Sequence, residues 1–423
     1  MVFVVRTSPV PGEVGVDLTR ETIVEFSGAL DPATVTSQSI QAVFGGEVLA
    51  ARPPRVSSDG RTVTLFYEEP LPASARVRVV IDGDLIRDAS GLLVDPEGDG
   101  SPGGVGILEF DTITITTLAD TAVCGRVFAS EFRETPEGEP VNLPLEGVVG
   151  RVDGTDIEVV TDAMGNFRLE PAPLGRFFVH VDGTTVPEAF LPDESTTPTQ
   201  FPDGPYYPNV GKTWESVAGR DTNVGNDFLP LIRAGTLQAV SQVADTEVAL
   251  PADVVAEFPE FAGVSLTVPV GSLFNDDGTP GSMVGIAPVP SDRLPGPLPE
   301  GLEFPVVITV QTGGATNFDT PAPICFPNLE GLAPGTQQFL YSFDHDRGQW
   351  VDVGPATVSG NGELICTDEG VGIRAPGWHG TAPPPDKPKL CRGRPSTRGF
   401  PWRPPGWRRR SQRHRRTTFS QVP

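Results

Sequence analysis

The stretch VVTDAMGNFRLEPAPLGRFFVHV, residues 159–181, decides the fold class of this chain. Two short apolar runs flank a turn at residues 162–166, and a second turn at residues 173–176 leads into an alternating apolar run. Asp162 can cap the first turn through its side chain, and Gly165 permits the positive φ that a tight turn requires. The stretch predicts a pair of hairpins with one buried face. The residues expected on that face are Phe167, Leu169, Phe177, Val179 and Val181.

The composition of the whole chain supports the same fold class. Its 423 residues include Gly 48 and Pro 46, together about 22% against an average near 12%. Such a composition favours many short strands and turns over long helices. Helical periodicity occurs only over the short stretch 251–258. We therefore expect an all-β protein of tandem β-sandwich domains, followed by a disordered basic tail.

Charge is distributed unevenly along the chain. Residues 1–386 contain 19 basic and 55 acidic residues, a net charge of −36, whereas residues 387–423 contain 12 basic residues and no acidic one. An acidic body repels nucleic acid and anionic membranes, so neither is an expected partner of the folded part. No apolar stretch approaches the ~18 residues of a membrane span. The start of the sequence shows no signal peptide, which fits either a cytoplasmic protein or a piece of a longer exported one.

Residues 1–117 form the first expected domain. Four β-rich runs, at 22–27, 61–67, 76–81 and 107–116, are separated by turn clusters, which predicts a sandwich. The segment also contains a series of motifs in a fixed order: Pro9-x-Pro11-Gly12, Val24-x-Phe26-Ser27, Leu30-Asp31-Pro32, Asp59-Gly60-Arg61-Thr62, Pro70-Leu71-Pro72 and Ile86-x-Asp88-x-x-Gly91. This order of motifs resembles the bacterial Ig-like domain named after the S-layer protein SbsA. That resemblance implies a spacer or interaction module without catalytic residues, of a kind found in surface-layer, adhesive and exported bacterial proteins.

Two further domains and a connecting segment are expected. Residues 118–185 resemble the carboxypeptidase regulatory-like domain, a transthyretin-type sandwich, through Thr161-Asp162-x-x-Gly165-x-Phe167-x-Leu169 and Gly175-x-Phe177. Residues 186–228, rich in Pro, Thr, Asp and Gly, read as an extended linker or arm. Residues 229–380 form a third β-sandwich, which resembles ZU5-type modules through Leu266-x-Val268-Pro269-x-Gly271 and Trp350. These resemblances imply interaction rather than catalysis.

Two groups of residues are candidate binding sites. Asp95, Glu97 and Asp99 alternate on a tight loop and could hold calcium, although position 106, where an EF-hand loop would need an acid, is glycine. The alternative is a polar surface loop. Tyr206, Tyr207 and Trp214 are the one aromatic cluster that could form a glycan-binding platform if the rings are exposed. No other cofactor is indicated.

Cysteine and histidine residues give few signs of chemistry. Cys325 and Cys366 lie in strand-like runs and could form a disulfide in an exported protein, the alternative being two buried thiols. His345 lies between Asp344 and Asp346, a pattern more typical of a solvated turn than of an acid–base site. The sequence contains no zinc-protease motif, nucleophile elbow, Walker loop or dinucleotide fingerprint.

The function expected from the sequence is structural. We expect a non-catalytic stalk, adhesion or surface-layer component of a bacterial cell-surface or secreted protein, with other surface proteins or polysaccharide as partners. The alternative is a carbohydrate-binding accessory module of an exported enzyme. The basic segment 381–423 is expected to be disordered. It is either a basic arm for an anionic partner or the product of a shifted reading frame in GC-rich DNA.

Overall fold

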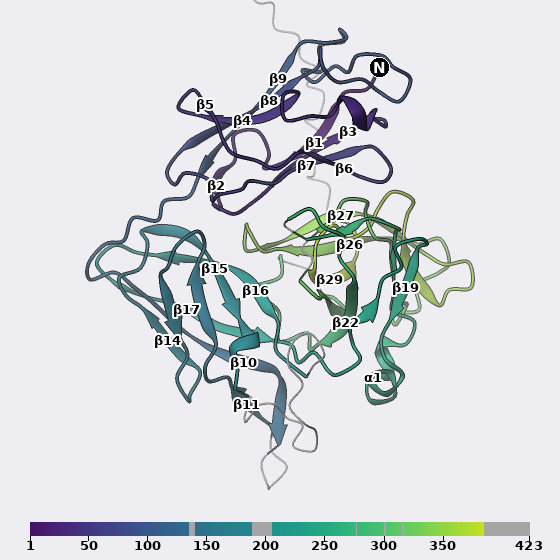
Figure 1. Ribbon diagram of the computed structural model, residues 1–423. Helices are drawn as coiled ribbons and strands as arrows, with labels where there is room; N and C mark the ends of the chain where they lie inside the picture. The colour runs from purple at the N-terminus through teal and green to yellow at the C-terminus, as the bar shows by residue number, and fades with distance from the viewer. Residues whose placement is uncertain (135–139, 188–204, 276, 300–301, 315–316, 385–423) are drawn as a thin grey trace, which may run out of the picture. The chain divides into compact units, whose positions relative to one another are not determined.

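The computed structural model describes residues 1–134, 140–187, 205–275, 277–299, 302–314 and 317–384 (Figure 1). These residues are almost entirely β-structure, as the composition predicts. Their single α-helix, α1 (Ala252–Glu257), coincides with the one stretch of helical periodicity in the sequence. In this described part of the chain, no helix has the length and apolar character needed to cross a membrane. Residues 1–384 form one compact unit. The expected tail beyond residue 384 lies outside the described residues.

The N-terminal domain is a sandwich of two sheets, with strand orders β1-β3-β7-β6 and β2-β9-β8-β4-β5. The period-two pattern of β9 turns Leu108 and Phe110 into the core and leaves Ile107 exposed. This is how an alternating sequence buries one face of a strand. The strands are β1 (Val4–Ser8), β2 (Val14–Val16), β3 (Thr22–Phe26), β4 (Ile40–Phe44), β5 (Glu47–Val48), β6 (Arg55–Val56), β7 (Thr62–Leu65), β8 (Arg76–Asp82) and β9 (Val105–Thr112), with a short 3-10 turn η1 (Pro32–Thr34).

The second domain is also a sandwich. One sheet has the order β13-β12-β15-β16, and in the other β10 pairs with β11, β14 and β17. Strands β10 and β17 run parallel, from Ala122 opposite Asp221 to Ala129 opposite Leu229. The strands are β10 (Ala122–Glu134), β11 (Pro140–Pro144), β12 (Val149–Val152), β13 (Glu158–Val160), β14 (Asn166–Leu169), β15 (Gly175–Asp182), β16 (Asn209–Ser216) and β17 (Asp221–Leu229), with a 3-10 turn η2 (Gly183–Thr185).

The stretch 159–181 forms the expected strands, turns and buried face, but not hairpins. Asp162 accepts hydrogen bonds from the Met164 and Asn166 amides, and Gly165 has φ +72°. Its strands β13 and β15 belong to one sheet, whereas β14 pairs with β10 in the other. The chain therefore crosses between the sheets at each turn. A local pattern of strand and turn is the same for a hairpin and for such a crossing, so the prediction of hairpins was wrong.

The segment 186–228, expected to be a linker, contributes two strands to the second sandwich. Strand β16 pairs along its whole length with β15, and β17 pairs with β10. The prediction failed because the inner face of β16 carries a lysine, Lys212, between Val210 and Trp214. This charge interrupts the apolar alternation from which strands are recognised. The described part of this segment therefore belongs to the second domain.

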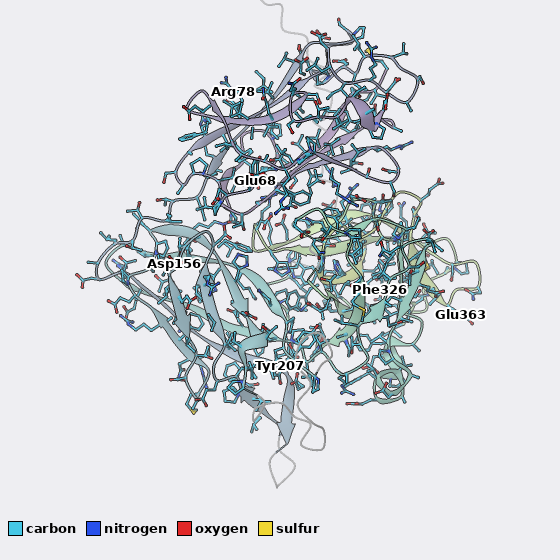
Figure 2. The ribbon with its side chains drawn as sticks, viewed as in Figure 1. Glu68, Arg78, Asp156, Tyr207, Phe326 and Glu363 are labelled. Atoms are coloured by element: carbon cyan, nitrogen blue, oxygen red, sulfur yellow. A yellow bond between two sulfur atoms is a disulfide. The ribbon has the colours of Figure 1, made fainter. Side chains whose placement is uncertain are left out.

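The third domain is built on one ten-stranded antiparallel sheet with the order β18-β22-β23-β29-β26-β27-β28-β25-β20-β19. Its core is enclosed by residues from both halves of the sheet, including Phe326, labelled in Figure 2, and Ile308. Strand β29 includes the buried Ala382, so the fold extends past residue 380. The strands are β18 (Gln238–Ala239), β19 (Thr246–Ala249), β20 (Ser265–Val268), β21 (Leu273–Phe274), β22 (Met283–Val289), β23 (Val307–Thr312), β24 (Asn317–Phe318), β25 (Ile324–Pro327), β26 (Gln337–Asp344), β27 (Gln349–Val358), β28 (Leu364–Thr367) and β29 (Gly377–Ala382), with a 3-10 turn η4 (Pro259–Phe261).

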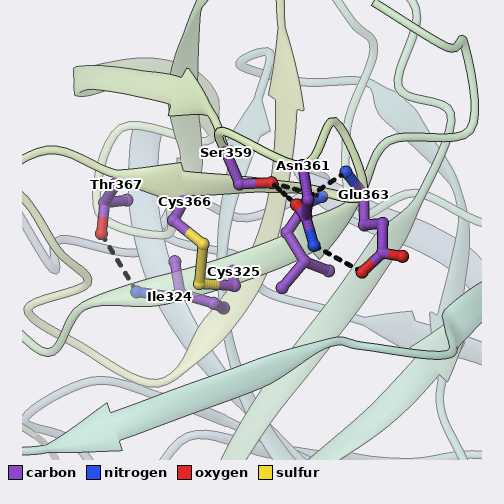
Figure 3. The surroundings of a disulfide bond; sticks show 8 residues. Ile324, Cys325, Ser359, Asn361, Glu363, Cys366 and Thr367 are labelled. Atoms are coloured by element: carbon purple, nitrogen blue, oxygen red, sulfur yellow. Dashed lines mark hydrogen bonds between the residues drawn. A yellow bond between two sulfur atoms is a disulfide. The ribbon is translucent and has the colours of Figure 1, made fainter. Parts of the chain in front are cut away.

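Cys325 and Cys366 form a disulfide within this sheet (Figure 3). The two residues are direct partners in the antiparallel pairing of β25 with β28. Beside them, the Ile324 amide donates a hydrogen bond to Thr367 Oγ1 at 3.1 Å. The structure thus selects the disulfide over the alternative of two free thiols. Disulfides of this kind are typical of proteins that mature outside a reducing cytosol.

Candidate functional site

The loop proposed for calcium uses its carboxylates to cap its own turns. Asp95 is buried, and its two carboxylate oxygens accept hydrogen bonds from the Gly98, Asp99 and Gly100 amides. Glu97 accepts from the Val105 amide and Asp99 from the Ser101 amide. Among the described residues, no three His, Cys, Asp or Glu side chains are grouped so that they could hold a metal ion. The loop is therefore stabilised by side-chain-to-backbone hydrogen bonds, as Asx turns are.

The aromatic cluster proposed for glycan binding is inside the protein. Tyr206, Tyr207 and Trp214 are 5%, 0% and 4% exposed, so none of the three rings offers a flat face to solvent (Tyr207 is labelled in Figure 2). Trp214 stacks on Phe167 with ring centroids 4.6 Å apart. Tyr207 donates a hydrogen bond to Glu131 at 2.5 Å. Tyr207 and Trp214 belong to the core of the second sandwich, and Tyr206 packs in a smaller cluster with Ile232 and Leu237. A buried position is usual for large aromatic side chains.

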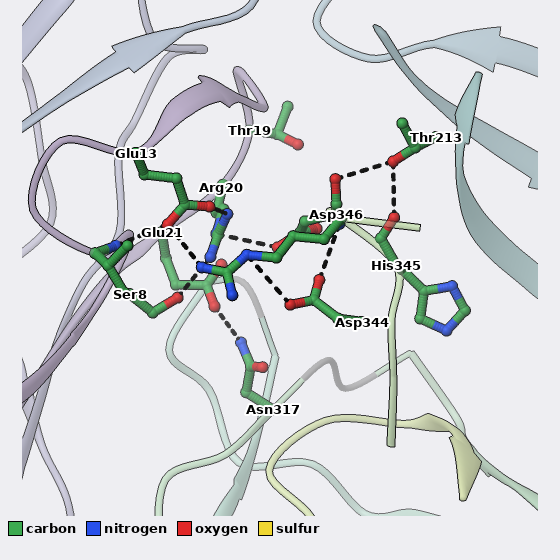
Figure 4. Close-up of polar contacts among 12 residues, drawn as sticks. Ser8, Glu13, Thr19, Arg20, Glu21, Thr213, Asn317, Asp344, His345 and Asp346 are labelled. Carbon is green, nitrogen blue, oxygen red and sulfur yellow. Dashed lines mark hydrogen bonds and ion pairs between the residues drawn. The ribbon is translucent and has the colours of Figure 1, made fainter. Parts of the chain in front are cut away.

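A different site appears where charged residues from all three domains meet. Arg20, in the loop between β2 and β3, lies at its centre (Figure 4). Its guanidinium contacts Glu13 Oε1 at 2.9 Å, Asp346 Oδ2 at 3.1 Å and Ser8 Oγ at 2.8 Å. Arg347 reaches the other oxygen of Glu13 at 3.3 Å. We call this network, together with the residues described next, the ionic junction.

Asp153 ties the first domain to the second. Its carboxylate accepts hydrogen bonds from the Leu18 amide at 2.7 Å and from the amide and hydroxyl of Thr19 at 3.1 and 2.7 Å. His180 Nε2 lies 2.9 Å from the same carboxylate. Burial alone would raise the pKa of Asp153, but these hydrogen bonds lower it below its usual value. Asp153 is therefore a charged acceptor that holds the 18–19 segment in place.

The turn between β26 and β27 ties the third domain to the second. Thr213 Oγ1 lies 2.9 Å from each of two backbone carbonyls, those of His345 and Asp346. In the same turn, His345 Nδ1 lies 2.6 Å from the carbonyl oxygen of Gly211. Because a carbonyl oxygen only accepts, Nδ1 carries a hydrogen and donates it. Burial lowers the pKa of His345 to about 4. His345 is thus a neutral structural donor, not part of the solvated turn that the sequence suggested.

The ionic junction borders a cavity of about 980 Å³ lined by residues of all three domains. Asp17 lines it with a buried carboxyl whose Oδ2 has no hydrogen-bond partner among the described residues. Burial, together with the nearby Asp346 and Asp153, raises the pKa of Asp17 to about 9. His379 also lines the cavity, and burial lowers its pKa to about 3. At neutral pH both side chains are therefore uncharged.

The arrangement joins parts of the chain that are far apart in the sequence. Glu13 and Arg347 are separated by 334 positions. Two more inter-domain ion pairs join Arg55 to the buried Asp319 at 3.1 Å and Arg374 to Glu25 at 3.0 Å. Sequence reasoning missed all of them, because periodicity and turn signals describe neighbours along the chain. The one feature of the sequence that pointed to this region was the polar turn at residues 344–347.

The N-terminal domain is similar to a known family. Residues 2–112 match the model of a family described as a bacterial Ig-like domain, as the motifs of that segment predicted. No curated protein sequence is significantly similar to the chain. The carboxypeptidase regulatory-like and ZU5-like resemblances of the later domains stay predictions.

Several solved structures are similar to parts of the chain. CopC from Methylosinus trichosporium OB3b is 18% identical, with 28% of this chain and 99% of CopC covered at a TM-score of 0.22. Domains 1–6 of the surface layer protein SbsC are 12% identical, with 89% and 54% covered at 0.23. The major pilin subunit BcpA of Bacillus cereus is 10% identical, with 54% and 70% covered at 0.20. The chain thus spans about half of the SbsC structure it matches.

Proposed function

We propose that this chain is a non-catalytic structural module of a bacterial cell-surface or secreted protein, in which three β-domains are joined as one stiff unit. The observation that carries the proposal is the ionic junction. Charged groups that would serve a reaction are instead paired with groups of another domain, as Arg20 is with Asp346 and Asp153 is with Thr19. Such pairing fixes the domains to one another.

The energetics of the junction favour a rigid connection. Breaking a buried ion pair by removing one partner costs ~3–5 kcal/mol, because the remaining charge is left buried and alone. Arg20 and Glu13 keep only 12% and 11% of their side chains exposed. Separation of the domains would also expose the apolar core that the second and third domains share, which includes Phe177, Phe343 and Trp350. Independent motion of the domains is therefore costly.

Two further features support a location outside the cytosol. The N-terminal domain matches a bacterial Ig-like family, and a disulfide links β25 to β28. Disulfides persist mainly in oxidising compartments. The strongly acidic body keeps copies of the protein apart and in solution, and it disfavours binding to nucleic acid. Other surface proteins or polysaccharide are the partners that this proposal implies.

Surface accessibility in the source bacterium tests the proposal. Antibodies raised against residues 1–384 should label intact cells or the culture medium, and protease added to intact cells should remove the label. A cytosolic marker protein, resistant under the same conditions, serves as the control for cell integrity. Labelling that appears only after lysis would overturn the proposal.

A further inference from the structure

Lys212 is the only lysine among residues 1–386. If histidine is left aside, all other basic residues of this segment are arginines. Lys212 lies on β16, on the face that carries the core residues Val210 and Trp214. Its side chain is 6% exposed. Lysine is rarely buried this deeply. A buried position at which the chain departs from its uniform use of arginine points to chemistry that a guanidinium does not perform.

The partner of this lysine is Asp227 on β17. Lys212 Nζ lies 3.0 Å from Asp227 Oδ1, and the Asp227 side chain is 11% exposed. The second oxygen, Oδ2, is buried and has no hydrogen-bond partner among the described residues. Lys212 Nζ also donates to the Pro295 carbonyl at 2.9 Å. The amine is therefore aimed at one carboxyl group whose other oxygen is left unsatisfied.

Both side chains of the pair are largely shielded from solvent, at a pocket whose walls are partly polar and partly apolar. Both residues line a cavity of about 510 Å³ whose walls include Trp214, Leu294 and Phe343. Transfer of one proton from the ammonium to the carboxylate gives a neutral amine beside a carboxylic acid, with the same atoms. Desolvated lysine amines are effective nucleophiles.

We propose that Lys212 and Asp227 join in an isopeptide bond. The amine nitrogen of Lys212 attacks Cγ of Asp227, one bond beyond the oxygen it already contacts. A C–N bond forms, a C–O bond breaks, and the hydroxyl leaves with one amine proton as water. No oxidant or other reactant is required. Atoms held ~3–3.5 Å apart in the right orientation react as in an intramolecular step.

The product fits the contacts that the structure already contains. The amide nitrogen keeps one hydrogen, which can still be donated to the Pro295 carbonyl. The remaining carbonyl oxygen replaces a carboxylate, so no charge stays buried. The adjoining cavity is large enough to receive the released water. The bond would link β16, the edge strand of one sheet, to β17 of the other, and so close the second sandwich along one side.

Mass spectrometry of the full chain tests the bond directly. The intact protein should be lighter than its sequence by one water, about 18 Da. Trypsin should release a branched peptide in which residues 177–220 are joined to residues 221–233, because cleavage after a modified Lys212 is blocked. Fragmentation should place the junction at Lys212 and Asp227. Free peptides 213–220 and 221–233 in the folded protein would overturn the proposal.

Two variants exclude other sources of water loss, such as cyclisation at the Asp-Gly sequences of this chain. Lys212→Arg keeps a cation opposite Asp227 but removes the amine, so its mass should equal that of its sequence. Asp227→Asn should lose ammonia, about 17 Da, in place of water. A loss of water that persists in Lys212→Arg would contradict the assignment. Because the readout is mass, it holds even if a variant is less stable.

Discussion

Gly165 shows how one backbone position controls the second sandwich. It has φ +72°, and an added Cβ would lie 2.4 Å from the Val127 carbonyl oxygen. We expect Gly165→Ala to lower the free energy of unfolding by about 2–4 kcal/mol, from a left-handed conformation and a clash with backbone. Gly219→Ala is the control, since Gly219 has φ +65° but open space around it, and it should cost only ~1 kcal/mol. Equal losses in denaturant titrations would contradict this account.

Asp17 makes the ionic junction sensitive to pH. Its pKa is raised from 3.8 to about 9, so the folded chain holds a proton that the unfolded chain releases above about pH 4. Between these values stability falls as pH rises, because the unfolded state binds fewer protons. Asp17→Asn should therefore stabilise the protein increasingly from pH 5 to pH 8, measured by thermal melting. The exposed Asp156→Asn is the control, and an advantage that does not grow with pH would refute the role of Asp17.

The sequence predicted the conformation of residues whose role depends only on their neighbours along the chain. Asp162 and Gly165 form the expected turn because an Asx cap and a positive φ are properties of the turn itself. Whether Tyr207 faces solvent or core is not a local property, and the sequence left that open. The carboxylates of Asp95 and Asp99 could serve a cation or their own backbone amides with the same spacing, and the fold uses the second arrangement.

At the scale of elements, the disulfide joins β25 and β28 across a sequence separation of 41 residues. Closing a loop of this length in the unfolded chain stabilises the fold by about 4 kcal/mol. Reduction should therefore lower the denaturation midpoint of the third domain, and Cys325→Ser should reproduce the loss without reductant. Cys124→Ser is the control, since Cys124 is a free thiol in the described chain. Identical midpoints with and without reductant would show that the link contributes nothing.

Strands were easier to predict than their partners. Strands β14 and β15 follow from alternating apolar residues, yet they belong to different sheets. Pairing depends on contacts such as β10 with β17, about a hundred positions apart, which no local pattern encodes. Strand β16 was missed because Lys212 occupies an inward position.

At the scale of the whole folded unit, Arg20 is expected to hold the first domain against the other two. Arg20→Ala leaves Glu13 with Arg347 as its remaining partner and removes the partner of the partly exposed Asp346, which should cost ~1.5–3 kcal/mol at the junction. Amide hydrogen exchange at Leu18 and Thr19, which donate to Asp153 of the second domain, should then accelerate. Arg6→Ala, which removes a half-exposed partner of Glu25, is the control and should cost at most ~1 kcal/mol. Unchanged exchange at Leu18 in Arg20→Ala would mean that the domains are held by other contacts.

The parallel pairing of β10 with β17 determines how the second domain responds to tension. The chain enters this domain at the start of β10 and leaves it at the end of β17. Because the two strands run side by side in the same direction, these points lie at opposite ends of the pair. A pull along the chain therefore slides one strand past the other and loads the hydrogen bonds between them together. The domain is therefore loaded in shear. An antiparallel pair that is pulled apart from one end would instead break its hydrogen bonds one after another.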